Sequence, residues 1–308
     1  MGTRTVGPLA GIDWLKNGTR LGRDNPKAVF GGAALALVVL MVLVVPVLLL
    51  QVLAQAQLSI TGIPATALSL LPMLVVLVLS AMFMVGFLRL LDAAAHGRAV
   101  GATTVFSGFR DIGGSLRAVG LMLLVMVANY ALLLALALVF APGFIAAYME
   151  LLQLGAGAGA GEQASAAVLE QMWIVIALMA PVNLFFYAVQ SVGLGQIVLR
   201  GHGVLAALAD GFAGAARNAV PLLLFAVLAV IAGLVIGLPI ALVAMLLAFV
   251  AGLVGTWLQV TLLVLAVPVY IALMVAMYAI MLAVMYCLWR DVCGGRDETE
   301  VAADALTA

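Results

Sequence analysis

The residue types best suited to catalysis or metal binding are few in this sequence and lie far apart. His96 and His202 are the only histidines and fall in different polar segments, while Cys287 and Cys293 stand at the end of the last apolar run. Hydrolases and metalloenzymes need such groups in clusters, and neither an H-x-x-x-H nor a C-x-x-C spacing occurs. The sequence therefore predicts no enzyme, cofactor or metal site. An enzyme acting on lipid headgroups would require His96 and His202 to meet in space.

Polar residues inside the apolar runs are the second candidate for chemistry. Asn183, Tyr187 and Gln190 are spaced by four and three residues, so they share one face of a helix, and Asn129 with Tyr130 could oppose them. Such groups are costly in hydrocarbon and normally turn inward to bond another helix. We predict an intramembrane polar cluster of Asn129, Asn183, Tyr187 and Gln190. It would either join helices or line the cavity of an uncoupled transporter or channel.

The apolar runs that hold these residues predict membrane-spanning helices. The chain is 67% hydrophobic and only 8% charged, whereas soluble domains carry roughly 25% charged residues, so lipid is the solvent that suits it. A span needs about 20 apolar residues. We therefore predict an all-α polytopic transmembrane bundle, a single integral membrane domain over residues 1–308, with six spans: about Val29–Gln51, Ala67–Leu91, Ala118–Phe140, Met172–Leu199, and two within Ala219–Trp289 that break at Gly252–Gln259.

The distribution of basic residues predicts the orientation of these spans. All 13 Lys and Arg residues fall on one side, and the opposite loops carry only Glu150, Glu162 and Glu170. Basic loops stay in the cytoplasm, so both termini are expected there, with residues 297–308 as a flexible cytoplasmic tail. Ala54-Gln55-Ala56 is similar to a signal-peptide cleavage site, but the apolar run before it exceeds the usual 7–15 residues. An uncleaved first helix is therefore favoured.

Three polar segments that precede the odd-numbered spans indicate an internal repeat, with units at about 11–98, 101–202 and 203–296. Each segment has a glycine followed seven residues later by Asn or Ser, directly before a span: Gly18 and Asn25, Gly108 and Ser115, Gly211 and Asn218. Asn and Ser side chains cap helix N-termini, and Pro26 suits the first helical position. We therefore predict three capped helix starts.

The residues before each cap predict three amphipathic helices that lie in the headgroup plane, although they could be short connectors instead. Their apolar stripes are Ile12 and Leu15 in the first copy, Val105, Phe109, Ile112 and Leu116 in the second, and Leu205, Leu208 and Phe212 in the third.

Arginines at the ends of spans two, four and six, and in the loop between spans two and three, are candidates for lipid contacts. Arg at such a position complements the helix dipole and reaches phosphate groups, or serves only as a topological anchor. The candidate headgroup contacts are Arg89, Arg98, Arg110, Arg200 and Arg290.

The predicted partners are membrane lipids, and no nucleic acid. The Gly233-x-x-x-Gly237 spacing could bring two helices together, within the bundle, between two copies of the chain or against another envelope protein.

The opening residues Gly11, Trp14, Gly18, Leu21 and Asn25-Pro26, followed by a long apolar helix, resemble those of an uncharacterised family of bacterial inner-membrane proteins. That family has about six spans and a W-x-x-x-G…N-P opening. It is distantly similar to the membrane domain of some glycerophosphodiester phosphodiesterases. The resemblance implies a bacterial cytoplasmic membrane and carries over no catalytic residue.

Two functions fit these features. The first is a non-enzymatic inner-membrane protein that organises the bilayer, interacts with lipid or assists other envelope proteins. The second is an uncoupled transporter or channel for a small or lipid-like solute, which requires a polar cavity at the intramembrane cluster.

Overall fold

The computed structural model describes residues 2–58, 65–147 and 161–294, and within these residues all regular elements are helical. Six helices are long and apolar enough to cross a membrane. They are α2 (Pro26–Leu58), α3 (Ala65–Ala95), α5 (Ile112–Phe140), α7 (Gly161–Arg200), α9 (Ala219–Val254) and α10 (Thr256–Cys293). The predicted all-α, six-span bundle is confirmed, while the predicted tail, residues 297–308, lies outside the described residues.

The break between the last two spans falls at Gly255, inside the predicted window. Gly255 has a φ of 133°, a backbone conformation that is open to glycine and strained for other residues. One glycine therefore divides the long apolar stretch into two helices.

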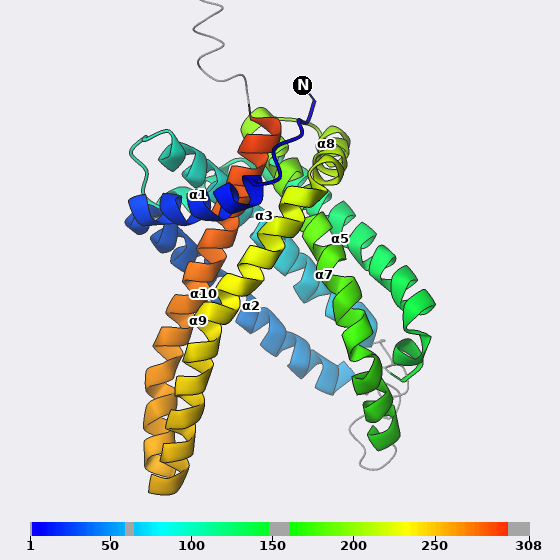
Figure 1. Cartoon of the computed structure of the whole chain (residues 1–308), viewed down its shortest axis with the longest axis vertical. Coiled ribbons are helices and arrows are strands. Elements are labelled where there is room, and N and C mark those ends of the chain that lie inside the picture. Colours follow the sequence, from blue (N-terminus) through cyan, green and yellow to red (C-terminus); the bar gives the residue numbers. More distant parts are fainter. Residues whose placement is uncertain (1, 59–64, 148–160, 295–308) are drawn as a thin grey trace, which may run out of the picture.

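The short helices gather at one end of the molecule, with the N-terminal segment and the end of α10 (Figure 1). They are α1 (Ala10–Asp24), η1 (Ala102–Phe106), α4 (Ser107–Arg110) and α8 (Val204–Arg217). Every described Lys and Arg lies in these helices, in the neighbouring turns or at the adjoining ends of the spans. We call this the basic end. From it the hairpins α2–α3, α5–α7 and α9–α10 diverge toward the opposite, splayed end (Figure 1).

Contacts between the spans form a closed ring. The second helices of the three hairpins, α3, α7 and α10, contact one another. The first helix of each hairpin contacts two of them: α5 contacts α3 and α7, α9 contacts α7 and α10, and α2 contacts α3 and α10. The contact of α2 with α10 joins the first hairpin to the last.

The short helices dock in a matching cyclic order. The η1–α4 segment packs on α2 and α3, and α8 packs on α5 and α7. The first short helix, α1, packs on α9 and α10. Each therefore covers the hairpin that precedes it around the ring, and α1 closes the ring.

Glycines, rather than the predicted apolar stripes, form the docking faces. The buried residues of α1 are Gly11, Trp14, Gly18 and Gly22, and those of α8 are Ala207, Gly211, Gly214 and Ala215. A Cβ on Gly18 would lie 2.8 Å from Val284, and one on Gly211 2.6 Å from the Val189 carbonyl oxygen. Ile12 and Leu205, from the predicted apolar stripes, are 41% and 75% exposed, while the small residues beside them allow two backbones to approach closely.

The second amphipathic segment is also not one helix. It consists of η1 and α4, a break at Asp111, and the first turn of α5. Val105 is buried and Phe109 packs on the core, but Ile112 and Leu116 are exposed.

Asn25 and Asn218 stand at the predicted positions, directly before α2 and α9, whereas Ser115 does not precede a helix. The side chains of Ser115 and Asn218 do not act as the predicted caps. The carbonyl of Asn25 accepts the Val29 N–H at 2.9 Å, at the start of α2 as predicted. Ser115 instead lies inside α5 and donates to the Gly108 carbonyl at 2.7 Å, because Asp111 is the N-cap. Asn218 stands between α8 and α9, but its side chain binds the N-terminal segment.

That segment is held by hydrogen bonds. Asn218 Oδ1 accepts the Val6 N–H at 2.8 Å, and Asn218 Nδ2 donates to the carbonyls of Arg4 and Gly214 at 3.1 and 2.9 Å. The Arg4 N–H donates to the Val292 carbonyl at 2.9 Å. The start of the chain is therefore fixed between α8 and α10.

Burial follows the same division between the two ends. The largest fully buried side chains include Trp14, Phe87, Phe225 and Tyr286, all in the half next to the basic end. Large apolar side chains of the splayed half are exposed, among them Val42, Leu50, Val235, Met245 and Val264. The core therefore occupies one half of the bundle, and the other half presents apolar surface.

Candidate functional site

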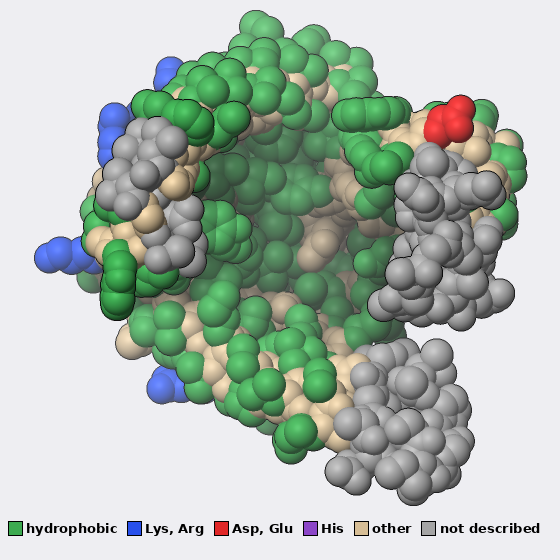
Figure 2. All heavy atoms as spheres, turned by 90° about the horizontal axis from the view of Figure 1, so that it is seen from below, with side chains coloured by type: hydrophobic (Ala, Val, Ile, Leu, Met, Phe, Trp, Pro, Cys, Tyr) green, Lys and Arg blue, Asp and Glu red, His purple; other side chains and the backbone are tan. Residues whose placement is uncertain are grey.

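A hollow opens between the three hairpins at the splayed end. Figure 2 looks into it from that end and shows that hydrophobic side chains line most of its wall. The end toward the short helices is closed, since α3, α7 and α10 meet there. The molecule thus has a blind apolar cavity that faces away from its basic end.

A smaller pocket of about 310 Å³ lies at the fork between the first two hairpins. Leu77 of α3 lines one side, while α5 and α7 supply the rest of the wall, including Met122 and Phe186. The pocket is also lined by all four residues of the predicted polar cluster: Asn129, Asn183, Tyr187 and Gln190. We call it the fork pocket.

Two hydrogen bonds organise the polar wall of the fork pocket. Asn129 Nδ2 donates to Asn183 Oδ1 at 2.9 Å, and the Tyr187 hydroxyl donates to the Met281 carbonyl of α10 at 2.7 Å. Asn129 Oδ1 is buried and has no hydrogen-bond partner among the described residues. The cluster therefore joins α5, α7 and α10 and leaves one acceptor unused.

The fork pocket lies far from the basic end along the helix axes. Asn129 follows Arg117 by 12 residues on one helix, which corresponds to about 18 Å at roughly 1.5 Å per residue. A hydrocarbon core is about 30 Å thick, so the pocket lies near its middle. An amide oxygen without a hydrogen bond at that depth is destabilising, and a ligand that donates a hydrogen bond to it would bind favourably.

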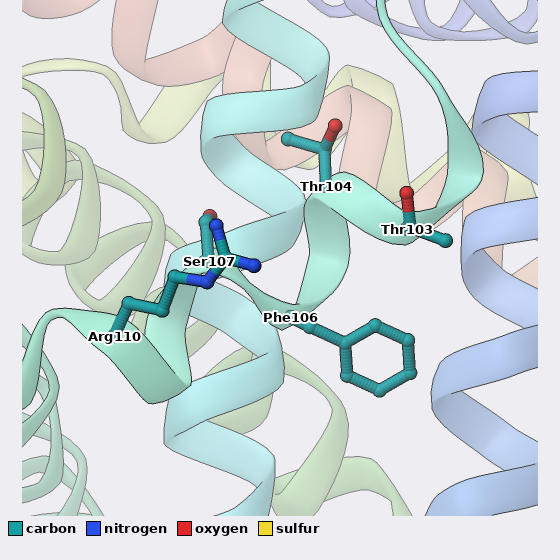
Figure 3. A pocket seen from close by; sticks show the side chains of 5 residues that line it. All are labelled: Thr103, Thr104, Phe106, Ser107 and Arg110. Atoms are coloured by element: carbon teal, nitrogen blue, oxygen red, sulfur yellow. The ribbon is translucent and has the colours of Figure 1, made fainter.

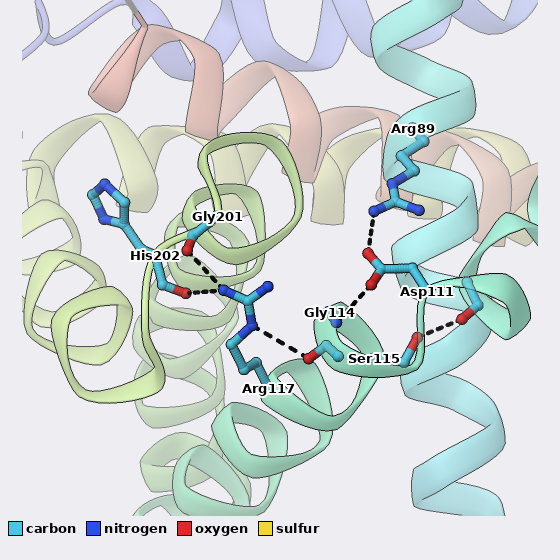
Figure 4. Close-up of polar contacts among 9 residues, drawn as sticks. Arg89, Asp111, Gly114, Ser115, Arg117, Gly201 and His202 are labelled. Atoms are coloured by element: carbon cyan, nitrogen blue, oxygen red, sulfur yellow. Dashed lines mark hydrogen bonds and ion pairs between the residues drawn. The ribbon is translucent and has the colours of Figure 1, made fainter.

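Salt bridges and hydrogen bonds join the short segments at the basic end (Figure 4). Asp111 forms an ion pair with Arg89 of α3 and accepts the Gly114 N–H at 2.9 Å. Arg117 donates from Nη1 to the carbonyls of Gly201 and His202, at 2.7 and 3.3 Å. The Gly114 N–H, followed by the Arg89 guanidinium, holds the pKa of the Asp111 carboxyl below its usual value.

Three further aspartates link helices at this end. Asp92 of α3 binds Arg98 and accepts the Tyr286 hydroxyl of α10 at 3.2 Å. Asp291 of α10 accepts the Trp14 indole N–H at 3.0 Å. Asp210 of α8 accepts the side-chain N–H of Gln196 in α7 at 2.9 Å.

Sequence reasoning missed these four carboxylates as site residues. For three of them the signal was an Asp one or three residues after an Arg at the basic end: Arg89 and Asp92, Arg110 and Asp111, and Arg290 and Asp291. Asp210 has no such arginine before it.

Four of the five candidate headgroup arginines contact protein groups. Arg89 binds Asp111, Arg98 binds Asp92, and Arg290 lies 3.4 Å from Asp291. Arg200 donates to the Cys293 carbonyl, with its guanidinium 5.7 Å from the Trp289 ring centroid. Arg110 is the fifth, exposed at the end of α4.

The two histidines contact different carboxylates. His96 Nδ1 lies 3.4 Å from Asp92, and His202 Nδ1 lies 3.4 Å from Asp210. Within residues 2–58, 65–147 and 161–294, no group of three or more His, Cys, Asp or Glu could hold a metal ion. The structure does not bring the histidines into one site.

The predicted glycine pair on α9 faces open space. A Cβ on Gly233 or Gly237 would have no neighbour within 4 Å. This face of α9 does not join helices within the described part of the chain, so contact with a second copy or another protein stays a prediction.

Six long apolar helices around a polar, glycine-packed end define an integral, multi-pass α-helical membrane protein. Comparison of the chain with models of protein families, with curated proteins and with solved structures gave no match. The function must therefore be argued from the cavity and its chemistry.

Proposed function

We propose that this protein is a non-enzymatic lipid-binding protein of the bacterial inner membrane that holds an amphiphile in the hollow between its hairpins. The single observation that carries this proposal is the blind apolar hollow of Figure 2, which is open at the splayed end. A wide apolar space inside a bilayer is filled by chains, because water gains no hydrogen bonds there.

The orientation follows from the basic end. Lys and Arg concentrate there, and basic segments remain in the cytoplasm. The hollow would then open toward the outer leaflet, with its blind end near the middle of the membrane. The bacterial source rests on the resemblance of the Trp14, Gly18 and Asn25-Pro26 opening.

We further propose that the protein consists of three like units. Their support is the cyclic docking order, in which each short segment covers the hairpin before it. The aligned Gly18, Gly108 and Gly211 all face a span of that preceding hairpin. Three like units in a ring would leave a central space, as observed in the splayed half.

The fork pocket indicates what kind of amphiphile fits. Its wall is apolar except for uncharged amide and hydroxyl groups, and Asn129 Oδ1 accepts no hydrogen bond from a described residue. A ligand with hydrocarbon chains and one hydroxyl or amide N–H satisfies both features. Charged groups would be costly at this depth.

Photo-crosslinking with two matched positions on α5 tests the proposal. Tyr130 lines the fork pocket and is 64% exposed, whereas Val127 on the same helix is 56% exposed and outside the pocket lining. Each is replaced by benzoylphenylalanine. The protein is extracted into detergent, washed free of bulk lipid and irradiated, and its intact mass is measured.

We expect a lipid adduct at position 130 and only detergent adducts at position 127, because a ligand held in the pocket survives washing. Detergent adducts alone at both positions, or equal lipid yields at both, would contradict the proposal.

The same unused acceptor also favours a second function, passive transport of a lipid-like solute. If the protein is a transporter, a fluorescent lipid should move between the leaflets of liposomes that contain it. The rate of this movement should fall severalfold in Asn129→Ala. Equal rates for the wild type, Asn129→Ala and protein-free liposomes would rule it out.

A further inference from the structure

A second pocket, of about 360 Å³, lies at the basic end, where the chain turns from α3 into α5. Thr103, Thr104, Phe106, Ser107 and Arg110 line it. Figure 3 shows that all five come from the continuous η1–α4 segment. Three hydroxyls and one guanidinium thus surround the pocket, and its lining includes no carboxylate.

Arg110 differs from the other described arginines because it has no hydrogen bond or ion pair within the described part of the chain. Ten arginines lie in the described residues, and nine of them hydrogen-bond or form ion pairs. Arg110 does neither with any described residue. The neighbouring carboxylate, Asp111, is already engaged by Arg89 and the Gly114 N–H. The positive charge of Arg110 is therefore available to a ligand.

The pocket also contains an unused hydroxyl. Ser107 Oγ is buried and has no hydrogen-bond partner among the described residues. A buried hydroxyl without a partner destabilises the protein, because it has lost its hydrogen bonds to water. A ligand that brings oxygen acceptors into the pocket would recover that loss.

The depth of the pocket matches that of lipid headgroups. A Cβ on Gly86 would clash with the Val105 carbonyl, and one on Gly32 would lie 2.9 Å from Val105. Gly86 is three residues before Arg89, and Gly32 is six residues after Pro26, so η1 lies about 5 Å below the level of Arg89 in α3 and about 9 Å inside the start of α2.

Aromatic contacts hold the segment at this depth. The Phe83 ring of α3 packs edge-on against Phe106 and Phe109, with centroids 5.9 and 5.1 Å apart. These contacts fix the segment against α3.

We propose that this pocket binds a phosphate group, with Arg110 as the charged donor and Thr103, Thr104 and Ser107 as hydroxyl donors. A guanidinium binds phosphate through two parallel N–H bonds. The depth of η1 favours an anionic phospholipid headgroup, and a soluble phosphate is the other source of the same group. The inference rests on the proposed membrane setting but not on occupancy of the hollow.

Binding is measured by native mass spectrometry of the full chain in non-ionic detergent. The probes are dioctanoyl phosphatidylglycerol, dioctanoylglycerol, which has the same chains without phosphate, and inorganic phosphate. Arg110→Gln removes the charge, and Thr103→Val with Ser107→Ala removes two hydroxyls. The matched control is Arg23→Gln, which removes the same charge from α1, where Arg23 is exposed beside Asp24.

We expect phosphatidylglycerol to bind more tightly than dioctanoylglycerol. Arg110→Gln should weaken it about tenfold, the hydroxyl variant severalfold, and Arg23→Gln less than twofold. Thermal unfolding midpoints close to that of the wild type show that the variants remain folded. Competition by inorganic phosphate that requires Arg110 would identify a soluble source, and its absence a lipid headgroup.

Equal losses in Arg110→Gln and Arg23→Gln, or no preference for the phosphate-bearing probe, would overturn the inference. Photo-crosslinking at Tyr130 is unaffected by Arg110→Gln in this account, so failure of the phosphate site and failure of the proposed amphiphile site are distinguishable.

Discussion

The two halves of this bundle are built by different means. At the basic end, glycine-lined helices dock against spans, and aspartates bond groups on neighbouring helices. In the splayed half the same spans part, and residues such as Val235 and Met245 are 67% and 73% exposed. Protein contacts thus determine the shape of one half, while the other half presents exposed apolar side chains.

This difference has a physical cause. Lipid chains are as apolar as Leu or Val, so burying such residues against one another gains little in a bilayer. Helices associate instead where backbones approach closely or polar groups bond, and both features concentrate at the basic end. A splayed half can therefore coexist with a rigid one in a single chain.

Adding one carbon to a glycine in each half should have opposite effects. In Gly86→Ala the new Cβ clashes with the Val105 carbonyl, so we expect the free energy of unfolding to fall by about 1–3 kcal/mol. Gly237 faces open space in α9, and Gly237→Ala should raise it by about 0.5–1 kcal/mol through helix propensity. Denaturant titration in mixed micelles measures both, and equal effects would remove the contrast between the halves.

Within the basic end, the linking aspartate should matter more than a surface one. Asp111→Asn keeps a capping side chain but removes the ion pair with Arg89 and the negative charge at the N-terminus of α5, so a loss of about 1 kcal/mol in unfolding free energy is expected. The control is Asp24→Asn, because the ion pairs of Asp24 with described residues are with the exposed Arg20 and Arg23, and its effect should stay below about 0.5 kcal/mol. A larger loss for Asp24→Asn would refute the assignment.

Acid should weaken the basic end through the same residue. The pKa of Asp111 is lowered in the folded protein, so its contribution is complete above the pKa of the unfolded chain, near 4. It is lost as the pH falls through the lower, folded value. Unfolding midpoints measured from pH 6 to pH 2 should therefore decline less in Asp111→Asn than in the wild type; parallel curves would contradict this.

The smallest effect is expected at the fork, where the halves meet. Asn129 and Asn183 share one hydrogen bond inside the membrane, and such bonds contribute about 0.6 kcal/mol on average. A double-mutant cycle with Asn129→Ala and Asn183→Ala should yield a coupling of that size. A coupling near zero would mean that the bond adds nothing to stability.

The sequence predicted the features that depend on local pattern. Hydropathy predicted the six spans, the glycines at Gly252–Gln259 predicted the break that falls at Gly255, and helical spacing predicted the cluster of Asn129, Asn183 and Gln190. Each of these depends on the properties of one segment or of two facing helices.

The features that depend on which residues far apart in the sequence become neighbours were not predictable in this way. Spacing predicted apolar stripes that include Ile12 and Leu205, but it did not indicate that small residues such as Gly11 and Gly211 form the buried faces, because docking here requires close approach rather than apolar area. Ser115 was expected to cap a helix that Asp111 caps instead. The aspartate partners depend on which helices become neighbours, which no local pattern encodes.

The central claim is that one half is closed and the other is held open around lipid. Spin labels at Val52 of α2 and Met245 of α9, both exposed in the splayed half, test it by pulsed electron resonance in lipid nanodiscs. A protein without introduced cysteines shows that buried Cys287 and Cys293 stay unlabelled. We predict a distance well beyond that of packed helices. A distance near helix contact, about 8–10 Å between axes, would show that the hollow has collapsed and would contradict the account.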